Sequence, residues 1–310
     1  MKKYEKVYKI VSIVLSALLC VALAFSLFGA TIISVGRDYL SSEKFDAQIE
    51  STDLSSLTFS HNGEEITLDK FVKDYLSNNI EGQINDSILG GIANLLNPFA
   101  GQITDFVVDQ TLSSTQVNKA VKTQIHSIVN YLLHSDADAA KERIEKGITL
   151  DTNPEFDSDN APTYEEKVNI EVKKAVFQYI ESESGYSIDQ IIIFISENTV
   201  KTLKTISAIL AIVILLLNLP QSWYALLYFG LALNGYSAIM YVMEYRFNEM
   251  YKEMGNLVSY QFLKPIMDAY LPYGEKAFIY GMVALVVGVV LIVGIKVISD
   301  KKEQKNKSQG

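Results

Sequence analysis

Alternating acidic side chains between residues 155 and 166 are the part of this 310-residue sequence best suited to chemistry. They fit the ligand positions of a calcium-binding loop, in the order Glu155, Asp157, Asp159, Asn160 and Glu166. Carboxylate and amide oxygens are the hard ligands that Ca²⁺ prefers, and the last carboxylate closes the cage. Asn160 stands where the pattern has glycine, and Pro162 stands where a backbone N–H is wanted. The sequence therefore offers a candidate site of weak calcium affinity, and a solvated acidic linker explains the same residues.

The histidines are the other candidates for metal binding or catalysis. His126 and His134 fall on one predicted helix, and Asp136 and Asp138 follow them. Eight residues of α-helix rise about 12 Å, so two imidazoles at that spacing are too far apart to share one ion. His61 is the third histidine, and the sequence has no serine in a nucleophile-elbow setting, so a hydrolase triad has little support. The sequence also has no phosphate-binding loop and no dinucleotide-binding fingerprint. We therefore expect a non-enzymatic protein without a cofactor.

The chain divides into an acidic block and apolar flanks with basic ends. Residues 37–200 hold 28 Asp and Glu against 12 Lys and Arg, a net charge of −16, whereas the rest carries +7. This division is typical of a membrane protein with one extramembrane domain. A domain of that charge repels nucleic acid, which is excluded as a partner. The only cysteine is Cys20, in the first apolar stretch, so we expect no disulfide in the acidic block.

Four apolar stretches are long enough to cross a bilayer, which takes roughly 20 residues. They cover residues 10–35, 202–219, 222–243 and 277–298. The first continues past a small-x-small sequence at residues 22–24, which favours an uncleaved anchor over a signal peptide. The sequence therefore predicts an all-α membrane protein with four transmembrane helices, and the lipid bilayer is its first partner.

Small residues repeat every four positions inside three of these stretches. Such spacing lets helix backbones approach closely in lipid, where no hydrophobic drive brings helices together. The repeating sets are Ser12, Ser16, Cys20 and Ala24, then Gly230, Asn234 and Ala238, and finally Ala284 with Gly288. The functional alternative for these faces is a pore or a dimer contact. No Asp, Glu, Lys, Arg or His lies deep in any stretch, which counts against an ion-coupled carrier.

Lysines at both ends of the chain predict its orientation. They are Lys2, Lys3, Lys6 and Lys9 before the first span, and Lys296, Lys301, Lys302, Lys305 and Lys307 at the end of the last. By the positive-inside rule, both termini lie in the cytoplasm and the acidic domain lies outside the plasma membrane. The bias is moderate, because six further basic residues flank the spans on the opposite side.

The acidic domain is predicted to be mostly helical. Residues 57–60 and 65–68 flank Asn62-Gly63, the composition of a small β-hairpin. Helical spacing of apolar residues follows positions 69, 113 and 163, and a last helix begins at position 187. Nothing after that position breaks a helix before residue 219, so we expect one long rod that continues into the second span.

These patterns predict an organisation in five parts. Residues 1–36 form a cytoplasmic tail and the first span, 37–200 the acidic extracytoplasmic domain, 201–243 a transmembrane hairpin, 244–276 an external amphipathic loop, and 277–310 the last span with its basic tail. Such an architecture favours a non-enzymatic envelope protein whose external domain binds a protein or another envelope component. The alternative is a channel or transporter subunit built on the small-residue faces.

Overall fold

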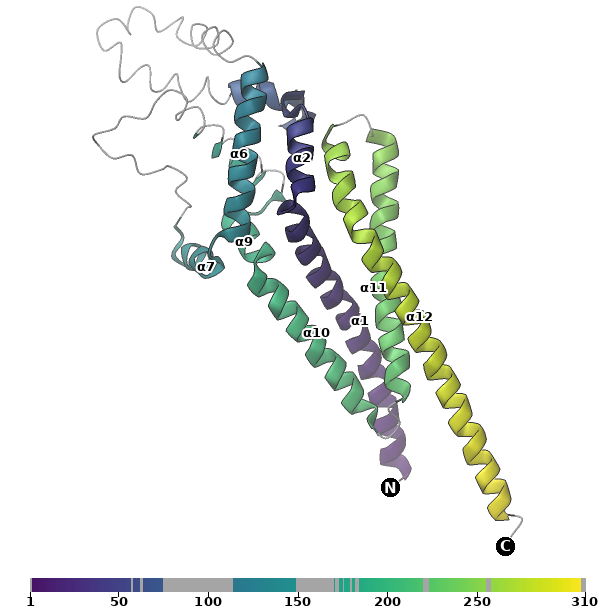
Figure 1. Ribbon diagram of the computed structural model, residues 1–310. Helices are drawn as coiled ribbons and strands as arrows, with labels where there is room; N and C mark the ends of the chain where they lie inside the picture. Colours follow the sequence, from purple (N-terminus) through teal and green to yellow (C-terminus); the bar gives the residue numbers. More distant parts are fainter. Residues whose placement is uncertain are drawn as a thin grey trace, which may run out of the picture. The chain divides into compact units, whose positions relative to one another are not determined.

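The computed structural model describes most of the apolar stretches and about half of the acidic block (Figure 1). The described residues are 2–56, 58–61, 64–74, 114–148, 170, 173–174, 176–178, 180–181, 184–219, 223–254 and 258–307. The chain forms two compact units. The membrane unit comprises Met1–Gly36, Glu197–Glu253 and Lys264–Gly310, and the acidic unit comprises Arg37–Ser196 and Met254–Leu263.

Long helices make up the membrane unit. They are α1 (Lys2–Leu40), α10 (Glu197–Leu217), α11 (Trp223–Met254) and α12 (Val258–Lys307). Among the described residues, each of these four helices contains a segment long and apolar enough to cross a membrane, at Val7–Leu40, Glu197–Leu217, Trp223–Glu249 and Lys264–Lys302. The prediction of a membrane protein with four apolar helices is confirmed.

Successive helices of the membrane unit run in opposite directions. The Ser12 hydroxyl near the start of α1 donates to the carbonyl of Leu217 at the end of α10 (2.9 Å), and Ser26 donates to Leu203 (2.9 Å). α11 and α12 pass each other in the same antiparallel sense, because Gly230 lies against Leu285 and Gly288 lies against Leu227. An antiparallel order is the one that four consecutive membrane crossings require.

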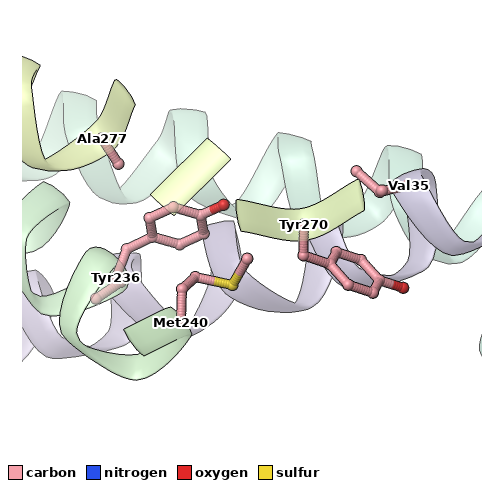
Figure 2. Packing of buried hydrophobic residues seen from close by; sticks show 6 residues of the cluster. Val35, Tyr236, Met240, Tyr270 and Ala277 are labelled. Atoms are coloured by element: carbon pink, nitrogen blue, oxygen red, sulfur yellow. The ribbon is translucent and has the colours of Figure 1, made fainter. Parts of the chain in front are cut away.

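The core of the membrane unit lies where α1, α11 and α12 meet (Figure 2). Its buried residues are Ala24, Val35, Tyr236, Met240, Tyr270 and Ala277. A second cluster joins α1 to α10 and α11 through Cys20, Leu23, Ile214, Ala225 and Ala232. The outward faces stay apolar: Ile10, Phe25, Ile209 and Val290 are all more than half exposed. Helices that are apolar on their outer faces as well as at their contacts are suited to lipid as solvent.

The described part of the acidic unit is built mainly from helices, of which α6 is the longest. They are α2 (Glu43–Ser51), the 3₁₀ turn η1 (Leu54–Ser56), α6 (Ser114–His134), α7 (Ala137–Lys146) and α9 (Ile188–Ile195). Strands β1 (Thr58–His61) and β2 (Glu64–Thr67) pair antiparallel, with Phe59 opposite Ile66. The predicted mixture of helices and one small hairpin is therefore present.

The predicted rod from residue 188 into the second span is wrong. α9 ends at Ile195, Ser196 adopts an extended conformation (φ −63°, ψ 153°), and α10 begins at Glu197. The Ser196 hydroxyl donates to the Ile193 carbonyl (2.9 Å). A serine side chain that bonds to nearby backbone offers the chain an alternative to the helix. Hydrophobic spacing alone did not reveal this break, because neither Gly nor Pro marks it.

The segment between the third and fourth spans, residues 244–276, also differs from the predicted amphipathic loop. α11 continues to Met254 and α12 begins at Val258, so most of this segment extends the two spanning helices. Pro265 and Pro272 lie inside α12. Proline has no backbone N–H to donate, so it usually breaks or kinks a helix in a soluble protein. Membrane helices tolerate proline better, because neighbouring groups satisfy the freed carbonyl.

Candidate functional site

The predicted calcium ligands fall in a segment that the structure does not describe. Glu155, Asp157, Asp159, Asn160 and Glu166 all lie outside the described residues. Near the middle of α6, the His126 side chain faces α2, with Nδ1 3.2 Å from Asp46 and Nε2 3.8 Å from Glu50. His134, at the end of α6, is exposed. Within the described ranges, no three His, Cys, Asp or Glu side chains are arranged to hold a metal ion.

The contact between α6 and the segment α2–η1 is a stripe of polar side chains at helical spacing. Asn118 accepts a hydrogen bond from the backbone N–H of Leu54 (2.8 Å), Lys122 donates to the Glu50 carbonyl, and His126 follows one turn later. Residues four apart on a helix share a face. This stripe therefore aligns α6 with α2 and η1, and His126 takes part in that contact.

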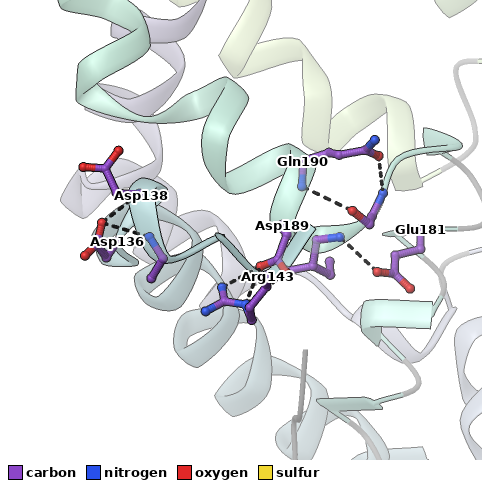
Figure 3. A network of polar contacts seen from close by, with 9 residues as sticks. Asp136, Asp138, Arg143, Glu181, Asp189 and Gln190 are labelled. Carbon is purple, nitrogen blue, oxygen red and sulfur yellow. Dashed lines mark hydrogen bonds and ion pairs between the residues drawn. The ribbon is translucent and has the colours of Figure 1, made fainter. Parts of the chain in front are cut away.

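The most buried charged group of the described acidic unit is Asp189, in the first turn of α9 (Figure 3). Its residue is only 5% exposed. Arg143 of α7 donates to it through Nη2 (2.6 Å to Oδ1) and through Nε (3.0 Å to Oδ2). This two-pronged pairing raises the pKa of the Arg143 guanidinium above its ordinary value. Each charged group offsets the cost of burying the other, and the hydrogen bonds between them hold α7 against α9.

Local capping positions the two helices that carry this pair. Asp136 caps α7 by accepting from the backbone N–H of Asp138 (2.8 Å), and Gly147 ends α7 in the left-handed conformation (φ 64°). Ser187 and Gln190 form a reciprocal capping box at the start of α9. Glu181 accepts from the Ile188 N–H (2.9 Å), an N-terminal donor that the helix itself leaves unsatisfied. The Asp136, Glu181 and Asp189 carboxylates in Figure 3 are thus engaged with the protein itself.

Arg37 joins the ends of two helices in the acidic unit. Its Nη1 donates to the carbonyl of Ile195, the last residue of α9 (2.9 Å), and its Nη2 donates to Leu133 near the end of α6 (3.0 Å). Carbonyls in the last turn of a helix lack intrahelical partners, and a cation there also complements the helix dipole. Only three of the chain's 27 basic residues are arginine, and two of them, Arg37 and Arg143, make such multidentate contacts.

Replacing Arg37 with lysine is expected to destabilise the acidic unit by about 1–3 kcal/mol, because an ammonium group lacks the planar fork that reaches two carbonyls. Thermal unfolding of the full-length chain, followed by circular dichroism, measures the change. Arg246→Lys is the matched control, since Arg246 is exposed on α11. Equal melting temperatures for the two variants would show that the Arg37 contacts contribute nothing.

The small residues of α1 lie against neighbouring helices. Ser12 bonds to Leu217, and Ser16 accepts from the Asn218 amide (3.0 Å). The Cys20 thiol donates to the Tyr228 carbonyl of α11 (3.1 Å). Ala24 lies 3.5 Å from the point where Gly235 would carry a Cβ. This face of α1 therefore contacts α10 with its first two members and α11 with its last two.

The contact between α11 and α12 is closer still. A Cβ on Gly230 would lie 2.7 Å from Leu285 Cγ and 2.8 Å from the Gly281 carbonyl oxygen, and one on Gly281 would lie 2.5 Å from the Asn234 amide nitrogen. Gly288 meets Leu227 at 2.8 Å in the same way. Of the other predicted packing positions, Ala284 is partly buried and Ala238 is exposed. The contact thus uses Gly230, Asn234 and Gly288, together with Gly281, which the four-residue spacing missed.

Removing the Ser26 hydroxyl tests the polar contacts between membrane helices. Ser26 donates to Leu203 and accepts from Ser207 (2.9 Å each), so Ser26→Ala breaks two interhelical hydrogen bonds. Bonds of this kind contribute about 0.6 kcal/mol on average and at most about 1.7. We expect the free energy of unfolding, measured by titration with a denaturing detergent in mixed micelles, to fall by an amount in that range. Thr205→Ala is the control, because Thr205 donates to Lys201 within its own helix and is exposed; an equal loss there would contradict the prediction.

No protein-family model, curated protein or solved structure matches this chain. The functional argument therefore depends on the chain's own geometry. In the described residues that geometry consists of close helix contacts in the membrane unit and self-satisfied polar contacts in the acidic unit.

Proposed function

We propose that this chain is a non-enzymatic protein of the cell envelope, anchored in the plasma membrane, whose acidic unit lies outside and binds a protein or another envelope component. One observation carries the proposal. The most buried carboxylate and the capping side chains of the described acidic unit are engaged in holding α6, α7 and α9, whereas the exposed side chains of α7 are mostly charged. Such a surface offers charge for recognition and no prepared reactive group.

The charge of the acidic block favours a basic partner surface. Its net charge of −16 produces a negative potential that attracts cationic surfaces and repels anionic ones. Association driven in this way weakens as salt is added, because the Debye length falls to about 8 Å at physiological ionic strength. The proposed partner class is therefore a basic protein segment or a cationic envelope component.

Photocrosslinking in intact cells tests the proposed recognition. A photoreactive residue at Glu142, exposed on α7, is expected to give a discrete adduct that weakens at high salt. The same residue at Ile209, on the outward face of α10, is the control and should label lipid. The proposal fails if Glu142 gives no adduct, or the same adducts as Ile209.

The proposed orientation follows from the basic ends and from the number of crossings. Four antiparallel spans return the chain to the side on which it began, so both termini share one side and the acidic unit takes the other. The division of the chain into units supports this arrangement, because the end of α11 and the start of α12, within Met254–Leu263, belong to the acidic unit. The lysine-rich ends favour the cytoplasm for the termini.

Thiol labelling tests this orientation directly. In a Cys20→Ser background, Lys119→Cys in α6 and Lys301→Cys in α12 each supply one exposed cysteine. An impermeant maleimide added to intact cells is expected to label the first and to reach the second only after lysis. The opposite pattern would place the acidic unit in the cytoplasm and remove the envelope proposal, while the fold would stand.

A channel or transporter subunit is the second candidate. It depends on the small-residue faces, and most of these residues contact helices of the same chain. We rank it below the recognition function for that reason. Purified full-length protein in liposomes, assayed for leakage of ions and small solutes, tests it: flux above that of empty liposomes would favour this candidate.

A further inference from the structure

α9 is mostly apolar, and its exposed residues are Gln190 and Phe194. Six of its eight residues are isoleucine or phenylalanine, and the only polar ones are Asp189, which pairs with Arg143, and Gln190 of the capping box. Ile188 and Ile192 are buried within the acidic unit. A surface helix of a soluble domain normally carries polar residues on its outer face. The exposed face of α9 instead combines the polar Gln190 with the apolar Phe194, a composition suited to the boundary between water and lipid.

Phe194 is the centre of that outer face. It lies one turn after Gln190 and roughly opposite the buried pair Ile188 and Ile192. Its side chain is 60% exposed, one of the highest values for a large apolar residue in the described acidic unit. α9 contains neither lysine nor glutamate, and Phe194 stands in a run of isoleucines. An exposed phenylalanine in this setting is suited to contact with a partly apolar surface.

The chain itself places Phe194 next to a bilayer. The apolar stretch of the second span begins at residue 202, so Glu197, the first residue of α10, lies five residues, or about 8 Å of helix, before it. Glu197 is therefore at the level of the headgroups, toward which Lys201 and Lys204 also extend their charges. Phe194 is three residues earlier, which is at most about 11 Å of chain.

The break at Ser196 frees α9 from the direction of α10. A continuous helix would carry residue 194 straight away from the membrane, whereas the extended Ser196 lets α9 take its own direction. An apolar helix face held at a membrane edge is the arrangement of interfacial helices. The lipid-facing surface of α10, with Ile206 and Ile209 exposed, begins within a few turns of the same edge.

We propose that α9 is an interfacial helix, with one face packed in the acidic unit and Phe194 on its outer face inserted at the boundary between lipid headgroups and acyl chains. The occupant of this face is the bilayer surface itself. The inference holds for either orientation of the chain in the membrane, because it depends only on the junction between α9 and α10.

Tryptophan fluorescence tests the proposal, because the chain contains a single tryptophan, Trp223. In a Trp223→Phe background, Phe194→Trp is reconstituted as full-length protein in phosphatidylcholine–phosphatidylglycerol vesicles. Ile209→Trp, exposed on α10, marks the hydrocarbon core, and Lys119→Trp, exposed on α6, marks water. We expect position 194 to be quenched several-fold more by a lipid with a nitroxide near its headgroup than by aqueous iodide, with emission between the two reference positions.

Two outcomes would overturn the proposal. Quenching of position 194 by iodide as strong as at position 119 would place Phe194 in water, and quenching by neither reagent would show that protein covers it. Phe194→Cys carrying a spin label, in a Cys20→Ser background, repeats the measurement by accessibility to oxygen and to a water-soluble nickel chelate. Contact with lipid predicts the higher accessibility to oxygen, and the reverse order contradicts it.

Discussion

Arg143→Met is expected to destabilise the packing of α7 against α9 by about 3–5 kcal/mol, because it leaves the Asp189 carboxylate buried without its partner. Breaking a buried ion pair from one side costs more than the pair itself contributes, since the remaining charge loses both water and its counter-ion. Hydrogen exchange of the α7 and α9 amides in the full-length chain measures the change. Protection of these amides should fall by about two to four orders of magnitude, as the free-energy change implies.

Two further variants separate the buried pair from ordinary surface charge. Lys146→Met, on the same helix, breaks an exposed pair with Glu142 and should cost no more than about 0.5 kcal/mol. The double variant Arg143→Met with Asp189→Leu removes both charges and is expected to regain most of the lost stability. If Arg143→Met and Lys146→Met behave alike, the guanidinium is not a structural contact.

The membrane architecture could be predicted from sequence because its signal is local. Each span is a continuous apolar run, and the four-residue repeat on α1 marks a face that does contact other helices. Which helix each small residue meets could not be predicted, because the contacts join residues about 200 positions apart, such as Ser12 and Leu217. Gly281 was missed for the same reason: its close contact depends on where Asn234 of another helix lies.

The polar contacts of the acidic unit are harder to predict from the sequence. Asp189 is an isolated acid in an apolar run, and Arg143 is one of only three arginines among the 27 basic residues. Both are signals for a buried pair, but 46 residues separate the partners, and spacing alone does not connect them. The break at Ser196 was hidden because a serine that ends one helix also fits the interior pattern of a longer one.

Gly230→Ala is expected to destabilise the contact of α11 with α12 by about 1–3 kcal/mol, because the added methyl group has no room. Its carbon would lie 2.8 Å from the Gly281 carbonyl oxygen, a backbone atom that no side-chain rotation can move aside. The two helices must therefore separate, which also weakens the contact of Gly281 with Asn234. Unfolding of the full-length protein by increasing mole fractions of denaturing detergent measures the loss.

Two other glycines in the same helices are matched controls for this close approach. Gly294 of α12 has no neighbour within 4 Å of an added Cβ, and Gly235 of α11 would meet Ala24 at an ordinary 3.5 Å. Alanine is the better helix former by up to about 1 kcal/mol, so Gly294→Ala and Gly235→Ala should be neutral or stabilising. All three substitutions add the same methyl group, so any difference among them reports the space between helices. A common small effect at all three positions would mean that the helices of this bundle are not held by close backbone contact.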